Sequence, residues 1–214
     1  MKHAKVILLL MSCLFLSCKE EVKGFDLSML IKDEIEGTYH YIEEERIDLF
    51  LPLDFYRINE ADHKDIAALI SDEKERQAFE KAMEIQSFLK DKTYNFIAQK
   101  YSAWLALTML PVTPFTRKEA GQVLFYINRR YDKIQDITGV YNEKISSSFS
   151  ATSKANIVNV VYKSIALDNK LENRVSYDNV YVISTKKKTI MIILTTLERV
   201  DFSGVISKIK LEDG

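Results

Sequence analysis

The chain has 214 residues, of which 47% are hydrophobic, 29% charged and 11% aromatic. A chain of this size and composition can bury its own core, which excludes an intrinsically disordered protein. Its formal net charge of −1 excludes the basic surplus that is typical of nucleic-acid-binding proteins. The six glycines and three prolines are too few for glycine-rich phosphate loops, so long regular elements are expected.

The first seventeen residues have the pattern of a secretory signal peptide. Lys2 and Lys5 form a positive head, and an apolar run follows from Val6 to Leu16. This run is shorter than the roughly 20 residues that a membrane-spanning helix needs. A serine and Cys18 close it, and charged residues follow. We therefore expect residues 1–17 to be a signal peptide.

A small residue before a cysteine at this boundary resembles the lipobox of bacterial lipoproteins. The resemblance implies a thioether-linked lipid on Cys18 and cleavage directly before it. Cys13 is the alternative acceptor, but it would leave only Val6 to Leu10 as the apolar segment. Phe15 stands where lipoboxes usually carry leucine. Since both cysteines fall at or before the lipidation site, the mature chain has no thiol for a disulfide or a nucleophile.

The three residues after Cys18 carry a narrower signal. Lys19, Glu20 and Glu21 resemble the acidic stretch of surface-exposed lipoproteins of the Bacteroidetes, which implies export to the outer face of the outer membrane. A solvated tether with no sorting role is the alternative, and it leaves a periplasm-facing location open. Residues 18–24 are expected to be the lipidated N-terminus and a short tether, and residues 25–214 a single globular domain.

The first half of the domain mixes helices and strands. A helix is predicted from about Leu27 to Ile35, and a second one begins at the capping residue Ser71. The pattern of Thr93 to Lys100 does not decide between a helix and a strand. The predicted strands are Thr38 to Ile42, Ile47 to Leu51 and the buried Trp104 to Leu110.

The second half opens with a strong helix signal. Thr116 and Glu119 form a capping box, and an apolar face continues from it, which predicts a helix from Arg117 to about Gln135. A closing helix is predicted from Asp201 or Ser203, with Ile209 on its apolar face. Between them the hydrophobic period changes to two and predicts an antiparallel meander of Ile145 to Ser150, Ile157 to Leu167, Arg174 to Ser184 and Thr189 to Thr196.

This order of elements predicts an α+β fold: a single antiparallel sheet with helices packed on its faces. The segment Thr189 to Thr196 is apolar on both faces, so it should be an interior strand with helices on either side. The opening strand ends in Leu51, Pro52 and Phe55, and a meander and a closing helix follow much later. That outline is similar to the PsbP/Mog1-like α/β/α sandwich. The resemblance implies a fold alone and assigns no functional residues.

The mature histidines are the candidate metal ligands. His40 could act with Glu43 to Glu45, and His63 with Asp62 and Asp65. Neither group has the HExxH spacing, so a solvated charged turn is the favoured interpretation. We predict no metal and no other cofactor.

Other polar groups also lack a catalytic pattern. Ser146 to Ser148 lie on a predicted strand and not on a GxSxG turn. The sequence does not decide whether two carboxylates are paired for glycoside hydrolysis, because their separation depends on the fold. Lys186 to Lys188 form a predicted hairpin tip that could touch lipid headgroups or an anionic glycan, although protection of the sheet edge is favoured. Arg129 and Arg130 are interpreted as complementing the end of the helix dipole.

The sequence therefore predicts a lipid-anchored cell-envelope protein. Its domain is expected to be a non-enzymatic binding or assembly module with a protein or glycan partner and without a nucleic-acid partner. The membrane contact would be the covalent lipid on Cys18. The alternative is a hydrolase acting on a cell-envelope polymer, with catalytic residues that the sequence does not identify.

Overall fold

The computed structural model describes residues 36–59, 62–69, 92–98, 102–166 and 174–211, together with residues 73, 76, 77, 79, 80 and 83. The predicted signal peptide, Cys18, the charged residues 19–21 and the predicted helix at 27–35 lie outside the described residues. At the second predicted helix, the described residues from 73 to 83 are helical.

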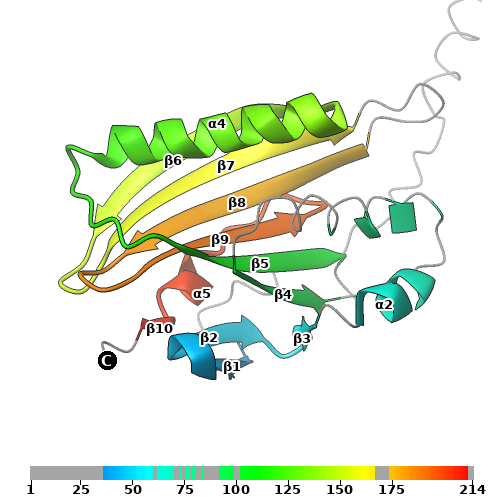
Figure 1. The fold of residues 1–214 in the computed structure, drawn as a ribbon, viewed down its shortest axis with the longest axis horizontal. Helices are drawn as coiled ribbons and strands as arrows, with labels where there is room; N and C mark the ends of the chain where they lie inside the picture. The colour runs from blue at the N-terminus through cyan, green and yellow to red at the C-terminus, as the bar shows by residue number, and fades with distance from the viewer. Residues whose placement is uncertain are drawn as a thin grey trace, which may run out of the picture.

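A seven-stranded antiparallel sheet forms the middle of the domain (Figure 1). Its strand order is β3-β4-β5-β9-β8-β7-β6. Two meanders, β3 to β5 and β6 to β9, join where β5 pairs with β9. The strands are β3 Tyr56–Ile58, β4 Thr93–Ala98, β5 Ala103–Leu110, β6 Val140–Ala151, β7 Asn156–Ala166, β8 Arg174–Ser184 and β9 Thr189–Thr196.

The predicted four-stranded meander is confirmed. The bounds of β8 and β9 agree with the prediction, whereas β6 begins earlier, at Val140, and has a register shift between Lys144 and Ser146. β9 pairs with β5 and β8 on its two sides, so it is the interior strand that its apolar residues predict. Ile190 and Ile192 are completely buried.

A second antiparallel sheet corrects the expectation of a single sheet. Its order is β1-β2-β10, with β1 at Gly37–Ile42, β2 at Ile47–Pro52 and β10 at Lys210–Leu211. The closing helix α5, Ser203–Ile206, is shorter than predicted, because the chain turns after Ile206 and extends to pair with β2. Local periodicity does not reveal a pairing between such distant parts of the chain.

The seven-stranded sheet separates two layers (Figure 1). On one face the long helix α4, Ala120–Thr138, packs over β6, β7 and β8, and the short helix α2, His63–Leu69, lies near β3 and β4. The three-stranded sheet and α5 cover the other face, where the prediction had placed helices. The side chains of β9 pack into both layers: Ile192 lies in the core with the small sheet, and Met191 lies in the core under α4.

The predicted capping residues Thr116 and Glu119 bond to each other, but they form the turn before α4, and the helix begins at Ala120 and not at Arg117. The Thr116 N–H donates to Glu119 Oε2 at 2.8 Å, and the Lys118 N–H donates to Thr116 Oγ1 at 3.2 Å. These bonds hold a turn that leads into the helix. Hydrogen bonds from the Thr116 hydroxyl and then from the Thr116 N–H lower the pKa of the Glu119 carboxyl. The helix ends at Gly139, whose φ of 70° is the left-handed conformation that glycine adopts easily.

Candidate functional site

A groove lies between the outer side of α4 and the edge strand β6. It has a volume of about 410 Å³, within the size range of small-molecule sites. Its residues come from the helix, from β6 and from the neighbouring β7. They are Phe125, Asn128, Arg129, Tyr131, Asp132, Gln135, Asn142, Lys144 and Tyr162.

The periods of the two elements bring these side chains together. Along α4, the lining positions from Phe125 to Gln135 recur every three or four residues, so they form one stripe. On β6, Asn142 and Lys144 are two residues apart and point to the same side of the sheet. Lys144 pairs with Tyr162 of β7, which places the tyrosine beside it at the floor of the groove.

Two stacked tyrosines form this floor. The ring centroids of Tyr131 and Tyr162 lie 3.9 Å apart, with an angle of 13° between the planes. The Tyr162 hydroxyl donates to Asn128 Oδ1 at 2.5 Å. Burial, with a smaller contribution from the nearby Asp132 carboxylate, raises the pKa of Tyr162 to about 12. The hydroxyl is therefore a protonated hydrogen-bond donor near neutral pH.

Asp178 of β8 lies behind the floor and joins its residues into one network. Asp178 Oδ2 accepts a hydrogen bond from the Tyr131 hydroxyl at 3.0 Å, and Oδ1 accepts one from the Thr195 hydroxyl at 2.6 Å. The Ser164 hydroxyl donates to Asn142 Oδ1 at 2.7 Å and lies 3.4 Å from Asp178 Oδ2. Asp178 thus connects both walls of the groove.

The protonation of Asp178 reflects two opposing effects. Burial disfavours the carboxylate and raises the pKa of Asp178, while the hydrogen bonds from Thr195, Tyr131 and Ser164 act in the opposite direction. The same enclosure raises the pKa of the Tyr131 hydroxyl far above its ordinary value. Asp178 is therefore an acceptor that holds Tyr131 in place, and its oxygens are occupied by protein hydroxyls.

Several groups that line the groove have no protein partner among the described residues. Asn128 and Gln135 use their carbonyl oxygens for bonds within the protein, to Tyr162 and to the Asn142 N–H, which leaves their amide nitrogens available. The Lys144 ammonium and the Asp132 carboxylate also have no ion-pair partner in the described part of the chain. The groove therefore offers mainly hydrogen-bond donors.

One aromatic ring and one cation, Phe125 and Arg129, complete the rim of the groove. The Phe125 side chain is 65% exposed, so one face of its ring is available to a ligand. The Arg129 guanidinium carbon lies 5.9 Å from its ring centroid, within the range of a cation–π contact. Arg129 and Arg130 were expected at the end of α4. The helix extends to Thr138, so both residues lie in its middle and do not complement the C-terminal dipole.

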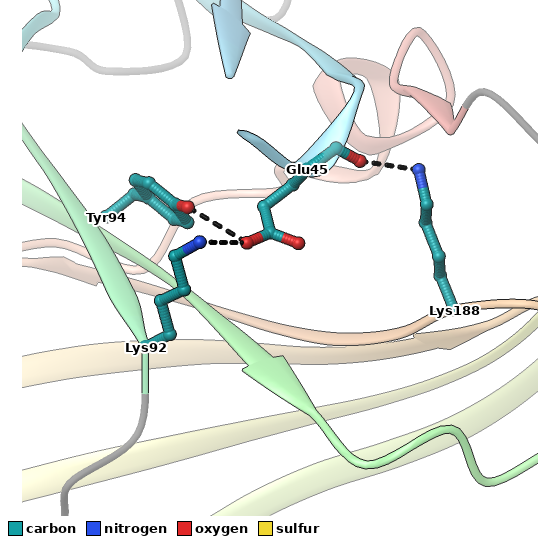
Figure 2. A network of polar contacts seen from close by, with 4 residues as sticks. All are labelled: Glu45, Lys92, Tyr94 and Lys188. Atoms are coloured by element: carbon teal, nitrogen blue, oxygen red, sulfur yellow. Dashed lines mark hydrogen bonds and ion pairs between the residues drawn. The ribbon is translucent and has the colours of Figure 1, made fainter. Parts of the chain in front are cut away.

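A second polar cluster joins the two sheets (Figure 2). Glu45 Oε1 accepts a hydrogen bond from the Tyr94 hydroxyl at 3.0 Å and lies 2.6 Å from the Lys92 ammonium. The Lys188 ammonium donates to the Glu45 carbonyl oxygen at 2.5 Å. The bond between the Lys92 ammonium and the Glu45 carboxylate raises the pKa of Lys92. The cluster ties the 3-10 turn η2, Glu43–Glu45, to β4 and to the β8–β9 hairpin, so its role is structural.

The predicted metal ligands lie against aromatic rings. The His40 ring meets Phe96 at a centroid distance of 5.3 Å, and the His63 ring meets Phe79 at 6.2 Å. Burial lowers the pKa of His40. Within the described ranges, no three His, Cys, Asp or Glu side chains are arranged to hold a metal ion. Glu45, one of the candidate carboxylates, is held by Lys92 and by a tyrosine hydroxyl.

The remaining predicted groups lie away from the floor of the groove. Ser146 to Ser148 are on β6, with Ser147 and Ser148 exposed. Lys186 and Lys187 are at the β8–β9 hairpin tip as predicted, while Lys188 turns back to the small sheet. Cys18 and residues 19–21 are not among the described residues. None of the described helices is long and apolar enough to cross a membrane.

Sequence reasoning did not identify the groove or Asp178. A usable signal existed for Asp178, because alternation along β8 places it on the same face as the buried Val180 and Val182. A carboxylate at such a position needs partners. The groove had no comparable signal, since Asn128 and Gln135 resemble the polar residues of any surface helix.

Comparisons with known proteins agree with the architecture. No protein-family model and no curated protein matches the sequence. The solution structure of a cyanobacterial PsbP protein, CyanoP from Synechocystis sp., is similar with a TM-score of 0.56. The match has 13% sequence identity and covers 83% of this chain and 93% of that one. The chain therefore has a mixed α/β fold with antiparallel sheets that is similar to PsbP, as the element order predicted.

Proposed function

We propose that this protein is a lipid-anchored, non-enzymatic binding module of the cell envelope that holds its partner in the groove between α4 and β6. The observation that carries the proposal is the groove itself. It combines an exposed ring, Phe125, with donors that have no protein partner among the described residues, and a stacked tyrosine pair supports it from below. A binding site needs this combination of fixed shape and unsatisfied polar groups.

The carboxylates around the groove favour binding over hydrolysis. A glycoside hydrolase commonly uses two carboxyl groups that both reach the scissile bond. Among the described residues lining the groove, Asp132 is the carboxylate, and Asp178 lies behind Tyr131 with its oxygens bonded to hydroxyls. The envelope hydrolase remains the second candidate, on the ground that the partner is expected to be an envelope polymer.

The anchoring part of the proposal rests on the sequence. Residues 1–17 have the pattern of a signal peptide, and Cys18 is in the position of a lipid acceptor. The acyl chains of a lipid on Cys18 would hold the protein at the membrane with about 0.8 kcal/mol per buried CH₂. Residues 19–21 then make the outer membrane, and its outer face in particular, the proposed location.

A binding experiment with the full lipidated chain tests this function. The protein in neutral-lipid nanodiscs is mixed with peptidoglycan fragments, with neutral and acidic oligosaccharides and with acidic peptides, and amide hydrogen exchange is followed. We expect one class to slow exchange in α4 and β6. Phe125→Ala should weaken that binding, whereas Leu197→Ala, at another exposed apolar residue, should not. If no class protects α4 and β6, the groove is not the binding site; if the bound polymer is recovered shortened, the protein is a hydrolase.

A further inference from the structure

We infer that the groove binds an acidic carbohydrate, with a sugar carboxylate seated between Arg129 of α4 and Lys144 of β6. The inference rests on the proposed function and specifies its ligand. Each wall of the groove supplies one cation. Neither cation is within ion-pair distance of a carboxylate in the described part of the chain, although Asp132 lines the same groove.

The balance of donors and acceptors points to an acceptor-rich ligand. Asn128 and Gln135 direct their carbonyl oxygens to protein donors, so each presents an NH₂ group to the groove. Together with Arg129 and Lys144, four side chains offer donors, while Asp132 offers an acceptor. A carboxylate accepts from cations in short, charge-assisted bonds, and Arg can bind it with two parallel donors.

The charges of the lining residues favour a ligand with a single negative charge at this position. Arg129 and Lys144 contribute two positive charges and Asp132 one negative charge, so the residues that line the groove carry a net charge of +1. A monoanionic carboxylate matches that value, whereas a dianionic phosphate would leave a surplus negative charge close to Asp132.

The rings and the edge strand favour a sugar over an acidic peptide. The exposed Phe125 ring offers a flat apolar face for the C–H side of a pyranose, and sugar hydroxyls can both donate to Asp132 and accept from Asn128. A peptide would add its main chain to the free edge of β6, but the register shift in the β6–β7 pairing between Lys144 and Ser146 bends β6 beside the groove, which disfavours a regular added strand.

Calorimetric titration with defined oligomers tests the inference. The probes are an oligogalacturonate, a neutral galactose oligomer of the same length and an oligoglutamate peptide, each added to the full lipidated chain in neutral-lipid nanodiscs. We expect the oligogalacturonate to bind at least about tenfold more tightly than either competitor, and its affinity to fall as salt is raised. Arg129→Gln and Lys144→Gln should each weaken it about tenfold. Lys133→Gln is the matched control, since Lys133 is exposed on α4 and does not line the groove.

The outcomes separate this inference from the proposed function. Equal affinity for the acidic and neutral sugars, or no effect of Lys144→Gln, would overturn the acidic ligand while groove binding stands. Tighter binding of the oligoglutamate would replace the carbohydrate by an acidic peptide. If no probe binds, and none of the peptidoglycan fragments, oligosaccharides and peptides protects α4 and β6 from hydrogen exchange, both proposals fall. All three replaced side chains are exposed, so unchanged thermal unfolding should confirm that each variant is folded.

Discussion

Replacing Asp178 separates its role as a hydrogen-bond acceptor from its charge. In Asp178→Ala the Tyr131 and Thr195 hydroxyls lose an acceptor at 3.0 and 2.6 Å, while Ser164 keeps its shorter bond to Asn142. Two orphaned hydroxyls at about 1–3 kcal/mol each lower the free energy of unfolding by about 2–6 kcal/mol. Asp178→Asn keeps one acceptor oxygen and removes the buried charge, so we expect it to stay within about 1 kcal/mol of wild type near neutral pH.

The pH dependence of the two proteins provides the sharper test. Because burial raises the pKa of Asp178 in the fold, the folded state holds its proton more tightly than the unfolded chain does. The contribution of this group to stability is therefore largest below the unfolded pKa and falls as pH rises through the folded pKa. Urea unfolding from about pH 4 to about pH 7 should show Asp178→Asn gaining stability relative to wild type. A pH-independent difference, or an Asn variant as unstable as the Ala variant, would refute this account of the network.

Three further predictions concern the core and the anchor. Ile192→Asp puts an unpaired charge at a fully buried position of β9 and costs about 5 kcal/mol or more, so circular dichroism should show an unfolded chain, whereas Ile145→Asp, at an exposed position, should fold. Cys18→Ala should leave an unprocessed precursor or release the protein from membranes; a processed, membrane-bound variant would contradict lipidation at Cys18. Changing residues 19–21 to Ala should remove protease access in intact cells at a stability cost within about 0.5 kcal/mol; unchanged access would leave them a plain tether.

The meander was predictable because its information is local. Each strand from β6 to β9 carries its own period of two, and Thr189–Thr196 shows by its apolar residues on both faces that it lies inside a sheet. The helix α4 was equally local, since Thr116 and Glu119 identify its start. The apolar pattern predicts an end at about Gln135, whereas the helix continues to Thr138, where Gly139 allows the chain to turn.

The small sheet was not predictable in the same way. β10 has two residues, too few to show a period, and it forms because β2 presents an unpaired edge to the returning chain. Ile209, expected on a helix, instead packs against the larger core from the turn between α5 and β10, where its N–H donates to the Ile206 carbonyl oxygen. Tertiary pairing here decides the conformation of a segment whose own preference is weak.

The placement of the groove explains how its residues can be specialised without a loss of stability. The larger apolar core lies on the opposite face of the sheet, between β4, β5, β9 and the small sheet, and α4 covers a separate core with Ile127 and Tyr131. The donors of the groove stand outside that second core, along α4 and on the edge strand β6. Replacing Arg129 or Lys144 therefore removes little buried surface, so their effect on binding can be measured in a folded protein. Asp178 is the exception, because it supports the floor of the groove and the packing of α4 together, and its variants should change both.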